Sequence, residues 1–306
     1  MTITVSPYTE HFVAEVGDVD LSRPLPAEDA AEIRAAFAHY AVLVFPGQSL
    51  DEEQHLAFTA LFGPHEKSIA VHRQDMVLRH RPEIADISNL NVENEIWGAD
   101  SRQRMFQLGN RLWHTDSSFR QLPGYASALY ARTIAPIGGH TQFADMRAAW
   151  DALPADEQAR LAPLVAEHSI FHSRARLGFT NFDEEERASL PPVLQRLARV
   201  IPESGRSSLY IASHVGRIVG MDDSQARELV DRLMAFATQP QFVHTHRWRV
   251  GDLVIWDNRC TMHRGTDFDD LRWTRDMRRS TVSDVANTCE QDIAVPVPGK
   301  APAASA

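Results

Sequence analysis

Cysteine is scarce in this chain, and it has no long apolar run. The two cysteines, Cys260 and Cys289, cannot build a disulfide framework, which indicates a reducing compartment. The opening residues, MTITVSPYTEHF, contain neither the basic nor the apolar region of a signal peptide. No segment approaches the ~20 apolar residues that are needed to cross a bilayer. We therefore expect a cytoplasmic protein that has no membrane partner.

An excess of basic residues is also missing. Lys and Arg number 31 against 41 Asp and Glu, a formal net charge of −10, which argues against a nucleic-acid partner. The hydrophobic content of 43% and the charged content of 24% are typical of a globular protein with a buried core. Neither a repeat nor an interior low-complexity linker divides the chain, so we expect a single domain over residues 1–295. The remaining residues, 296–306, read PVPGKAPAASA and are predicted to be a disordered tail.

The periodicity of apolar residues predicts a mainly β protein with helices, of the α+β class. Helical patterns cover residues 27–40, 147–160, 184–199 and 224–237. Strand patterns cover residues 42–45, pieces of 125–145, 208–211, 253–256 and the segment after Thr274. Ser49 and Glu52 have the spacing of a capping box, which predicts the start of a further helix. Because strands lie at both ends of the second half and helices lie between them, the pattern favours a β-sandwich or barrel with helical insertions.

The stretch WHTDSSF, residues 113–119, places a histidine two residues before an aspartate. His114 and Asp116 have the residue types and spacing of two metal ligands. With 14 histidines in the chain, however, about one such pair is expected by chance. Taken alone, the pair is better explained by a surface pair or a local hydrogen bond.

A second informative stretch, GDLVIWDNRCTMHRG (251–265), contains His263 and is soon followed by RDMRR (275–279). On a strand, Arg275 and Arg279 point to one face, whereas Arg278 points to the other face, where we expect it to be solvated. Two histidines and one carboxylate form the facial triad of non-haem Fe(II) oxygenases. Near pH 7 both residue types are available in the ligating forms, neutral imidazole and ionised carboxylate. The open metal positions could bind a 2-oxo acid, whose far carboxylate one arginine would hold, and the other arginine would be free for an acidic substrate.

Five motifs occur in a fixed order: WHTDSSF, GGHTQFADM (138–146), SGRSSLYI (204–211), GDLVIWDNRCTMHRG and RDMRR. With this set the chain resembles the taurine dioxygenase and 2,4-dichlorophenoxyacetate dioxygenase family, the Fe(II)/2-oxoglutarate-dependent oxygenases, over about residues 4–285. The motifs are most similar to those of dioxygenases that cleave aryloxyalkanoic acids. The resemblance implies a double-stranded β-helix, or jelly roll, with helical insertions.

Residue roles are carried over from this resemblance, motif by motif. It implies that His114, Asp116 and His263 bind iron, and that no further residue is catalytic. Thr141 and Arg275 would hold the C5 carboxylate of 2-oxoglutarate, and Arg279 would bind the acidic group of the primary substrate. Twelve residues separate His263 from Arg275, one more than in better-known members, so a neighbour of Arg275 stays an alternative for that role.

The implied reaction hydroxylates the carbon next to the ether oxygen of an aryloxyalkanoic (phenoxy) acid. Its products would be a phenol and a 2-oxo acid, together with succinate and CO₂, and O₂ would be consumed. The first alternative keeps the chemistry and changes the substrate to a sulfonate or an alkyl sulfate. Two more distant alternatives are a hydrolase or lyase with zinc or another divalent ion, and a non-catalytic metal-binding scaffold. We also expect a homo-oligomer and a small-molecule carboxylate substrate.

The remaining histidines are more simply explained by packing. His244 and His246 alternate on one predicted strand, but no third ligand accompanies them, so a second metal site is not favoured. His168, His172 and His214 could line a substrate pocket, although partly buried structural histidines are the preferred interpretation.

Overall fold

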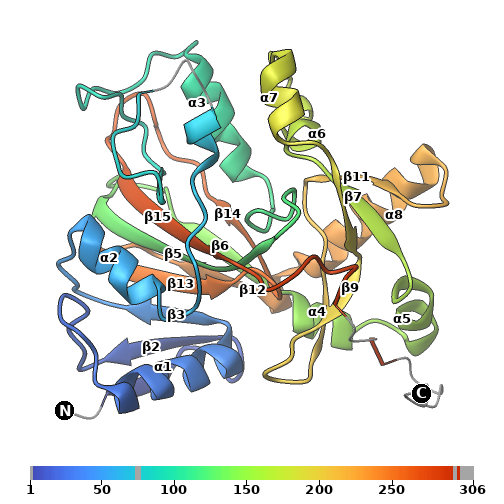
Figure 1. Cartoon of the computed structure of the whole chain (residues 1–306), viewed down its shortest axis with the longest axis horizontal. Helices are drawn as coiled ribbons and strands as arrows, with labels where there is room; N and C mark the ends of the chain where they lie inside the picture. Colours follow the sequence, from blue (N-terminus) through green and yellow to red (C-terminus); the bar gives the residue numbers. More distant parts are fainter. Residues whose placement is uncertain (1–2, 73–76, 292–294, 297–306) are drawn as a thin grey trace.

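A computed structural model describes residues 3–72, 77–291 and 295–296 (Figure 1). The predicted tail therefore lies outside the described residues, apart from Pro296. Among the described helices, none combines the length and the apolar character that a membrane span requires. The described residues form a mixed α/β structure in which all fifteen strands lie in sheets, which agrees with the predicted class.

The largest sheet has seven strands in the order β1-β2-β3-β13-β5-β15-β4. Neighbouring strands run antiparallel except β2 and β3, which are parallel. The strands span Thr4–Pro7 (β1), Val13–Gly17 (β2), Val42–Phe45 (β3), Ile84–Asp86 (β4), Gly124–Thr133 (β5), Leu253–Asp257 (β13) and Asp276–Ser283 (β15).

Both faces of this sheet are buried at its centre, which explains why β3 is the unbroken apolar run VLVF. Alternate side chains of a strand point to opposite faces. Leu43 and Phe45 pack with the helix side of the sheet, in the same cluster as Phe37, whereas Val42 and Val44 pack in a second cluster with Trp256. A strand that is covered on both sides reads as continuously hydrophobic.

A three-stranded sheet, ordered β12-β6-β14, packs through the second cluster. Its strands span Val243–His246 (β12), Thr141–Asp145 (β6) and Thr261–Gly265 (β14). Phe143 of β6 and Trp256 of β13 are fully buried, and their ring centroids lie 5.4 Å apart. The apolar core therefore joins the two sheets.

The helices lie in three groups (Figure 1). Ala27–Tyr40 (α1) and Glu52–Thr59 (α2) pack on the large sheet, and Arg102–Gln107 (α3) lies near its β15 end with the 3-10 turns Ile69–His72 (η1) and Leu108–Arg111 (η2). The third group belongs to residues 146–242, which lie between β6 and β12 and are called the inserted segment below. It consists of Met146–Asp151 (α4), Ala155–Leu161 (α5), Ile170–Ala175 (α6), Glu184–Ser189 (α7), Asp223–Ala237 (α8) and the 3-10 turn Pro240–Phe242 (η3).

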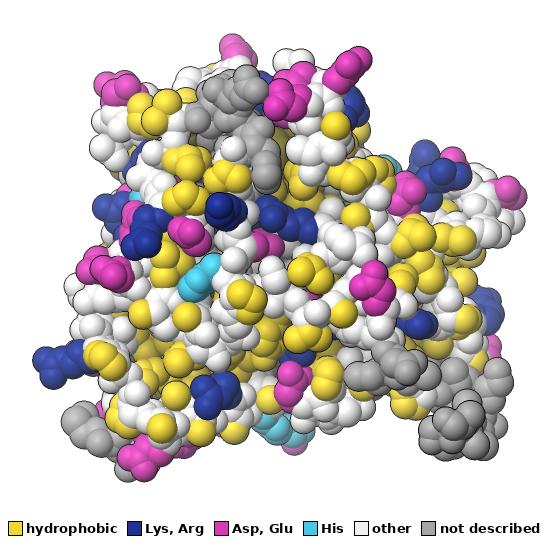
Figure 2. Space-filling view, viewed as in Figure 1, with side chains coloured by type: hydrophobic (Ala, Val, Ile, Leu, Met, Phe, Trp, Pro, Cys, Tyr) yellow, Lys and Arg dark blue, Asp and Glu magenta, His cyan; other side chains and the backbone are white. Residues whose placement is uncertain are grey.

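The inserted segment also contains two small sheets and a core of its own. The strands are Val165–His168 (β7), Val193–Arg196 (β8) and Val215–Ile218 (β11) in one sheet, and Ala198–Val200 (β9) and Ser207–Leu209 (β10) in the other. Trp150, Leu197 and Leu233 belong to its buried apolar cluster. Acidic and basic side chains are interspersed over the face of the molecule in Figure 2.

Several predicted elements are confirmed, among them the helix at 27–40 and the strands at 42–45 and 253–256, and three predictions are corrected. The helix predicted at 184–199 ends at Ser189 because Pro191 and Pro192 follow, and strands β8 and β9 take its place. The helix predicted at 147–160 is two helices, α4 and α5, with Pro154 at the N-cap of the second. Asp51, not Ser49, caps α2 and forms the capping box with Gln54.

Candidate metal centre

The backbone places two histidines of distant motifs directly opposite each other. His114 and His263 form an isolated antiparallel bridge, in which the N–H of each residue donates to the carbonyl of the other at 3.0 and 2.7 Å. Side chains of directly opposed residues lie on the same side of the pair and close together. The two imidazole centroids are accordingly 4.2 Å apart.

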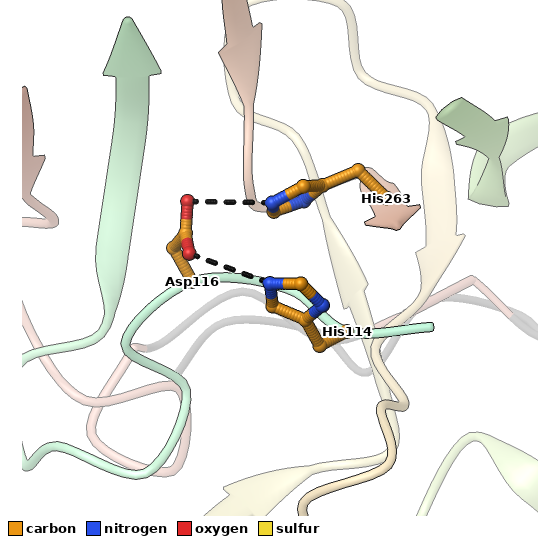
Figure 3. A group of neighbouring side chains, drawn as sticks. All are labelled: His114, Asp116 and His263. Carbon is orange, nitrogen blue, oxygen red and sulfur yellow. Dashed lines mark ion pairs between the residues drawn. The ribbon is translucent and has the colours of Figure 1, made fainter. Parts of the chain in front are cut away.

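The carboxylate of Asp116 faces both imidazoles (Figure 3). Its Oδ1 lies 3.8 Å from Nε2 of His114, and its Oδ2 lies 3.7 Å from Nε2 of His263. The chain turns sharply here, because Ser117 has a left-handed φ of 57°. The three ligand atoms lie within 4.8 Å of one another, close enough to bind one metal ion.

Asn258 holds the turn that presents Asp116. Its side-chain oxygen accepts hydrogen bonds from the backbone N–H of Asp116 (3.1 Å) and from Nε1 of Trp256 (2.9 Å). Its amide donates to Oγ of Ser127 (2.9 Å), and this hydroxyl in turn donates to Oδ2 of Asp116 (2.8 Å). The sequence alone assigned no role to Asn258, although this residue lies in the same motif as His263.

The ligand set has the protonation state that a divalent metal requires. Burial lowers the pKa of His114 to about 4 and that of His263 well below its usual value, so both imidazoles are neutral at pH 7. Burial alone would raise the pKa of Asp116, but Arg279 and the two histidines outweigh it and lower that pKa. His114 Nδ1 lies 2.7 Å from the carbonyl oxygen of Leu112; its proton must therefore sit on Nδ1, which leaves Nε2 free to bind metal.

A chamber opens beside the triad. Its empty space is about 1060 Å³, counting the mouth that is open to solvent, and His114 and Asp116 contribute to its wall. Arg279 of β15 also lines it and donates from Nη1 to Oδ1 of Asp116 at 2.5 Å. Much of the remaining wall is apolar, with residues such as Phe106 and Phe119. The chamber thus combines a metal-ligand cluster, a cation and an aromatic lining.

Arg275 lies in an adjoining pocket that shares part of its wall with the chamber. It is buried, and its Nε donates to the carbonyl of Gly139 at 3.1 Å. Burial lowers its pKa to about 10, so the guanidinium stays charged near neutral pH. Arg275 therefore presents a charge beside the turn that precedes β6.

Thr141 begins β6 and is paired with Gly265, while Phe143 is paired with His263. The strand period of two consequently places the side chains of Thr141 and His263 on the same face of this sheet. The Thr141 hydroxyl accepts a hydrogen bond from Nε1 of Trp248 at 3.0 Å. It does not line either of the two pockets described above.

Two residues of the chamber were not predicted as site residues. His214 lines it, with Nδ1 3.0 Å from Oγ of Ser173, whereas His168 and His172 do not contribute to its wall. Arg174 of α6 lines it as well. The sequence had offered His214, together with His168 and His172, as a possible pocket residue. It gave no signal for Arg174.

Two further predictions on polar residues have clear outcomes. Arg278 does point away from the triad, but it is buried, not solvated: it donates to the carbonyl of Leu50 at 2.7 Å and lies over the ring of Tyr130. His246 forms an ion pair with Asp252, with 3.0 Å between Nε2 and Oδ2, in keeping with a packing role.

A second cluster, made of His80, Asp86 and Asp276, has ligand atoms close enough for a metal. Arg79 pairs with Asp86 at 2.9 Å and Arg132 pairs with Asp276 at 3.0 Å. The arginines already balance the carboxylates, so this cluster is an ion-pair network.

The triad, with an open chamber on one side, is the arrangement of a mononuclear metal enzyme of the facial-triad class. Residues 4–281 match the sequence family described as "Taurine catabolism dioxygenase TauD, TfdA family". The chain belongs to this family, and the predicted family is thereby confirmed.

Three relatives illustrate the similarity. The chain is 41% identical to the alpha-ketoglutarate-dependent 2,4-dichlorophenoxyacetate dioxygenase of Cupriavidus pinatubonensis, over 94% of this chain and 99% of that one. It is 35% identical to the (S)-phenoxypropionate/alpha-ketoglutarate-dioxygenase of Sphingobium herbicidovorans, over 87% and 90%. The crystal structure of AAD-2 in complex with Mn(II) and N-oxalylglycine superposes with a TM-score of 0.87 and 44% identity, over 95% of this chain and 100% of that one.

Proposed function

We propose that this enzyme hydroxylates the carbon next to the ether oxygen of aryloxyalkanoic acids. The hydroxylated product collapses to a phenol and a 2-oxo acid, while 2-oxoglutarate and O₂ are converted to succinate and CO₂. The observation that carries the proposal is the chamber, because it brings a cation, Arg279, and an aromatic wall up to the metal-ligand cluster. The relatives named for acting on such acids support the same substrate class.

The donor set fits Fe(II), since it offers two neutral imidazoles, one carboxylate and an open side. His114, Asp116 and His263 would hold the ion. When bound, Fe(II) supplies the oxidative chemistry with O₂ and 2-oxoglutarate. The protein contributes position: the Leu112 carbonyl fixes the ring of His114, and Asn258 fixes the backbone of Asp116.

Arg275 and Thr141 would bind the C5 carboxylate of 2-oxoglutarate. Arg275 is a buried guanidinium that donates hydrogen bonds to the carbonyl oxygens of Gly139 and Ile87, which leaves its charge available for an anion. Thr141 offers a hydroxyl on the same sheet face as His263.

Arg279 would bind the carboxylate of the substrate, and the aryl group would lie against the apolar wall formed by residues such as Phe106 and Phe119. This arrangement orients the C–H bond next to the ether oxygen toward the metal. Holding the reacting atoms in place is the protein's main contribution to the rate.

The fold and the assembly add three proposals. The seven-stranded and three-stranded sheets correspond to the two sheets of a jelly roll, the core that the family resemblance implies. Residues 1–295 would form one catalytic domain, and copies of the chain would associate into a homo-oligomer.

The test is O₂ uptake with Fe(II), ascorbate and 2-oxoglutarate, measured with phenoxyacetates, both enantiomers of 2-phenoxypropionate, taurine and alkyl sulfates. Uptake that is matched by phenol release from an aryloxy acid is the expected result. Uptake with sulfonates or sulfates alone would replace the proposed substrate class. No stimulated uptake in protein shown to bind iron would remove the substrate claim.

The metal site has a separate test. Anaerobic Fe(II) plus 2-oxoglutarate should give a weak visible metal-to-ligand band, which His114→Ala should abolish. A band that is intact in this variant would contradict the ligand assignment.

A further inference from the structure

Six arginines are buried in the part of the chain that the structure describes, and four of them form ion pairs. Arg147 pairs with Asp145, Arg199 with Asp284, Arg259 with Asp257, and Arg278 with Glu52. The remaining two are Arg174 and Arg275. A buried charge without an opposite charge is expensive, so an unpaired buried arginine needs another explanation. For Arg275 the proposed function already supplies one, the carboxylate of 2-oxoglutarate.

Arg174 has few polar contacts within the described residues. It is 5% exposed, and its Nη1 donates to Oγ of Ser173 at 3.3 Å. Its Nε is buried and has no hydrogen-bond partner. Burial, together with repulsion from Arg279, lowers its pKa to about 10, so it remains a cation at neutral pH.

The guanidinium of Arg174 is held in a fixed place. It lies 4.5 Å from the ring centroid of Phe106, a cation–π distance. A Cβ added to Gly109 would come within 2.1 Å of its Cζ, so the bare backbone of η2 lies directly against the group. A flat cation that is stacked in this way is already oriented for a ligand.

Arg174 lines the same chamber as His114 and Arg279. Three of the four carboxylates that the described wall contains have arginine partners: Asp116 pairs with Arg279, Glu66 approaches Arg120, and Asp86 pairs with Arg79. The fourth is Glu83. Among the described residues of the wall, Arg174 is therefore the arginine without a carboxylate partner, whereas Arg279 is already engaged by Asp116.

We infer that Arg174 binds the carboxylate of the aryloxy acid directly and forms a two-arginine clamp with Arg279. This inference rests on the proposed function and adds a residue that decides substrate specificity. The clamp makes the chamber selective for acids over neutral aryl ethers. Arg279 also stays close to Asp116, so binding of the acid and the charge of the triad are linked through one guanidinium.

The experiment measures binding, not turnover. Phenoxyacetate and its neutral methyl ester are titrated anaerobically into the Fe(II)–2-oxoglutarate enzyme, and the change in the visible band gives Kd. Arg174→Gln is compared with Arg176→Gln, which alters a half-exposed arginine two residues away. We expect Arg174→Gln to raise Kd for phenoxyacetate about tenfold to a hundredfold, the usual effect of losing charge-assisted hydrogen bonds. Affinities for the ester and for 2-oxoglutarate should stay within about twofold.

Gly109→Ala provides a second variant, which keeps the charge but displaces the guanidinium through the added Cβ. It should weaken binding of the acid selectively as well. Equal losses for acid and ester would reveal a structural role, and unchanged binding of the acid in Arg174→Gln would overturn the inference alone. If the unmodified enzyme forms the 2-oxoglutarate band but binds no aryloxy acid, both this inference and the proposed substrate class fail.

Discussion

At the scale of single residues, two of the three proposed metal ligands depend on groups that their motif does not specify. His114 is oriented by a carbonyl two residues earlier, and Asp116 is held by Ser127 and Asn258. Asn258 forms hydrogen bonds with five residues, since its backbone carbonyl also accepts from the hydroxyl of Thr115 at 2.6 Å and its backbone N–H donates to the carbonyl of Tyr125 at 2.8 Å. Such supporting groups decide how accurately a metal site is formed.

Asn258→Ala should therefore weaken Fe(II) binding by roughly 10- to 100-fold, the usual cost of losing a supporting group. Anaerobic Fe(II) titration of the 2-oxoglutarate band measures the effect. The matched control is Asn287→Ala, because Asn287 is also buried and donates to two carbonyls, of Gln121 and Leu194. Equal loss of Fe(II) affinity in both variants would mean that general destabilisation, not the triad turn, is responsible.

The two arginines of β15 should separate kinetically. Arg275→Ala is expected to raise KM for 2-oxoglutarate, whereas Arg279→Ala is expected to raise KM for the aryloxy acid, each by roughly tenfold or more. Steady-state kinetics with each cosubstrate varied in turn provides the measurement. A collapse of 2-oxoglutarate affinity in the Arg279 variant would exchange the two assignments.

At the scale of elements, the loop before β6 joins the proposed cosubstrate site to the sheet. Gly138 and Gly139 both have positive φ, 75° and 65°. A Cβ on Gly138 would lie 2.1 Å from the backbone oxygen of Asp267, so this turn fits closely against the loop after β14. The carbonyl of Gly139 then receives the guanidinium of Arg275.

Gly138→Ala should lower stability well beyond the ~1–2 kcal/mol of left-handed strain, because rigid backbone must also move. Gly47→Ala is the control, since its φ of 65° imposes the same strain while its Cβ would meet open space. Urea unfolding of both variants compares the two costs. Similar losses would show that backbone strain alone matters at Gly138.

At the scale of the whole molecule, buried neutral histidines link stability to pH. His55 lies in the core between α2 and the large sheet, with Nε2 3.2 Å from the carbonyl of Ala128. Burial lowers the pKa of His55 to about 3, and burial likewise lowers that of His168 to about 3. Below pH 6.5 the unfolded chain therefore binds protons that the folded chain does not.

The stability that these neutral histidines allow is fully present above pH 6.5 and declines as the pH falls toward 3. Each histidine should contribute a slope of about 1.4 kcal/mol per pH unit within that window. In His55→Gln the slope of the unfolding free energy against pH, measured between pH 6 and 4, should be smaller by about 1.4 kcal/mol per pH unit, which corresponds to one proton. An unchanged slope would exclude His55 as a source of the effect.

Much of this protein could be predicted from local sequence patterns. The apolar spacing in 27–40 gave α1, and the continuous run VLVF gave a strand that is buried on both faces. The order of five motifs was sufficient to predict the family, which the comparison confirms. Prediction failed where local signals competed. A single helix was predicted over 184–199 from its composition, but Pro191 and Pro192 end the helix, and the residues after them pair as strands β8 and β9.

By itself, the sequence determined which side chains are available as ligands and in what order they occur, because residue type and short spacing encode that chemistry. Only the tertiary structure decided which of them meet. His114 and His263 become paired neighbours, Arg278 becomes buried, and Arg174 of α6 comes to line the chamber of Arg279. The physical reason is that burial and proximity depend on the path of the whole chain through its sheets. The periodicity of a few residues does not predict that path.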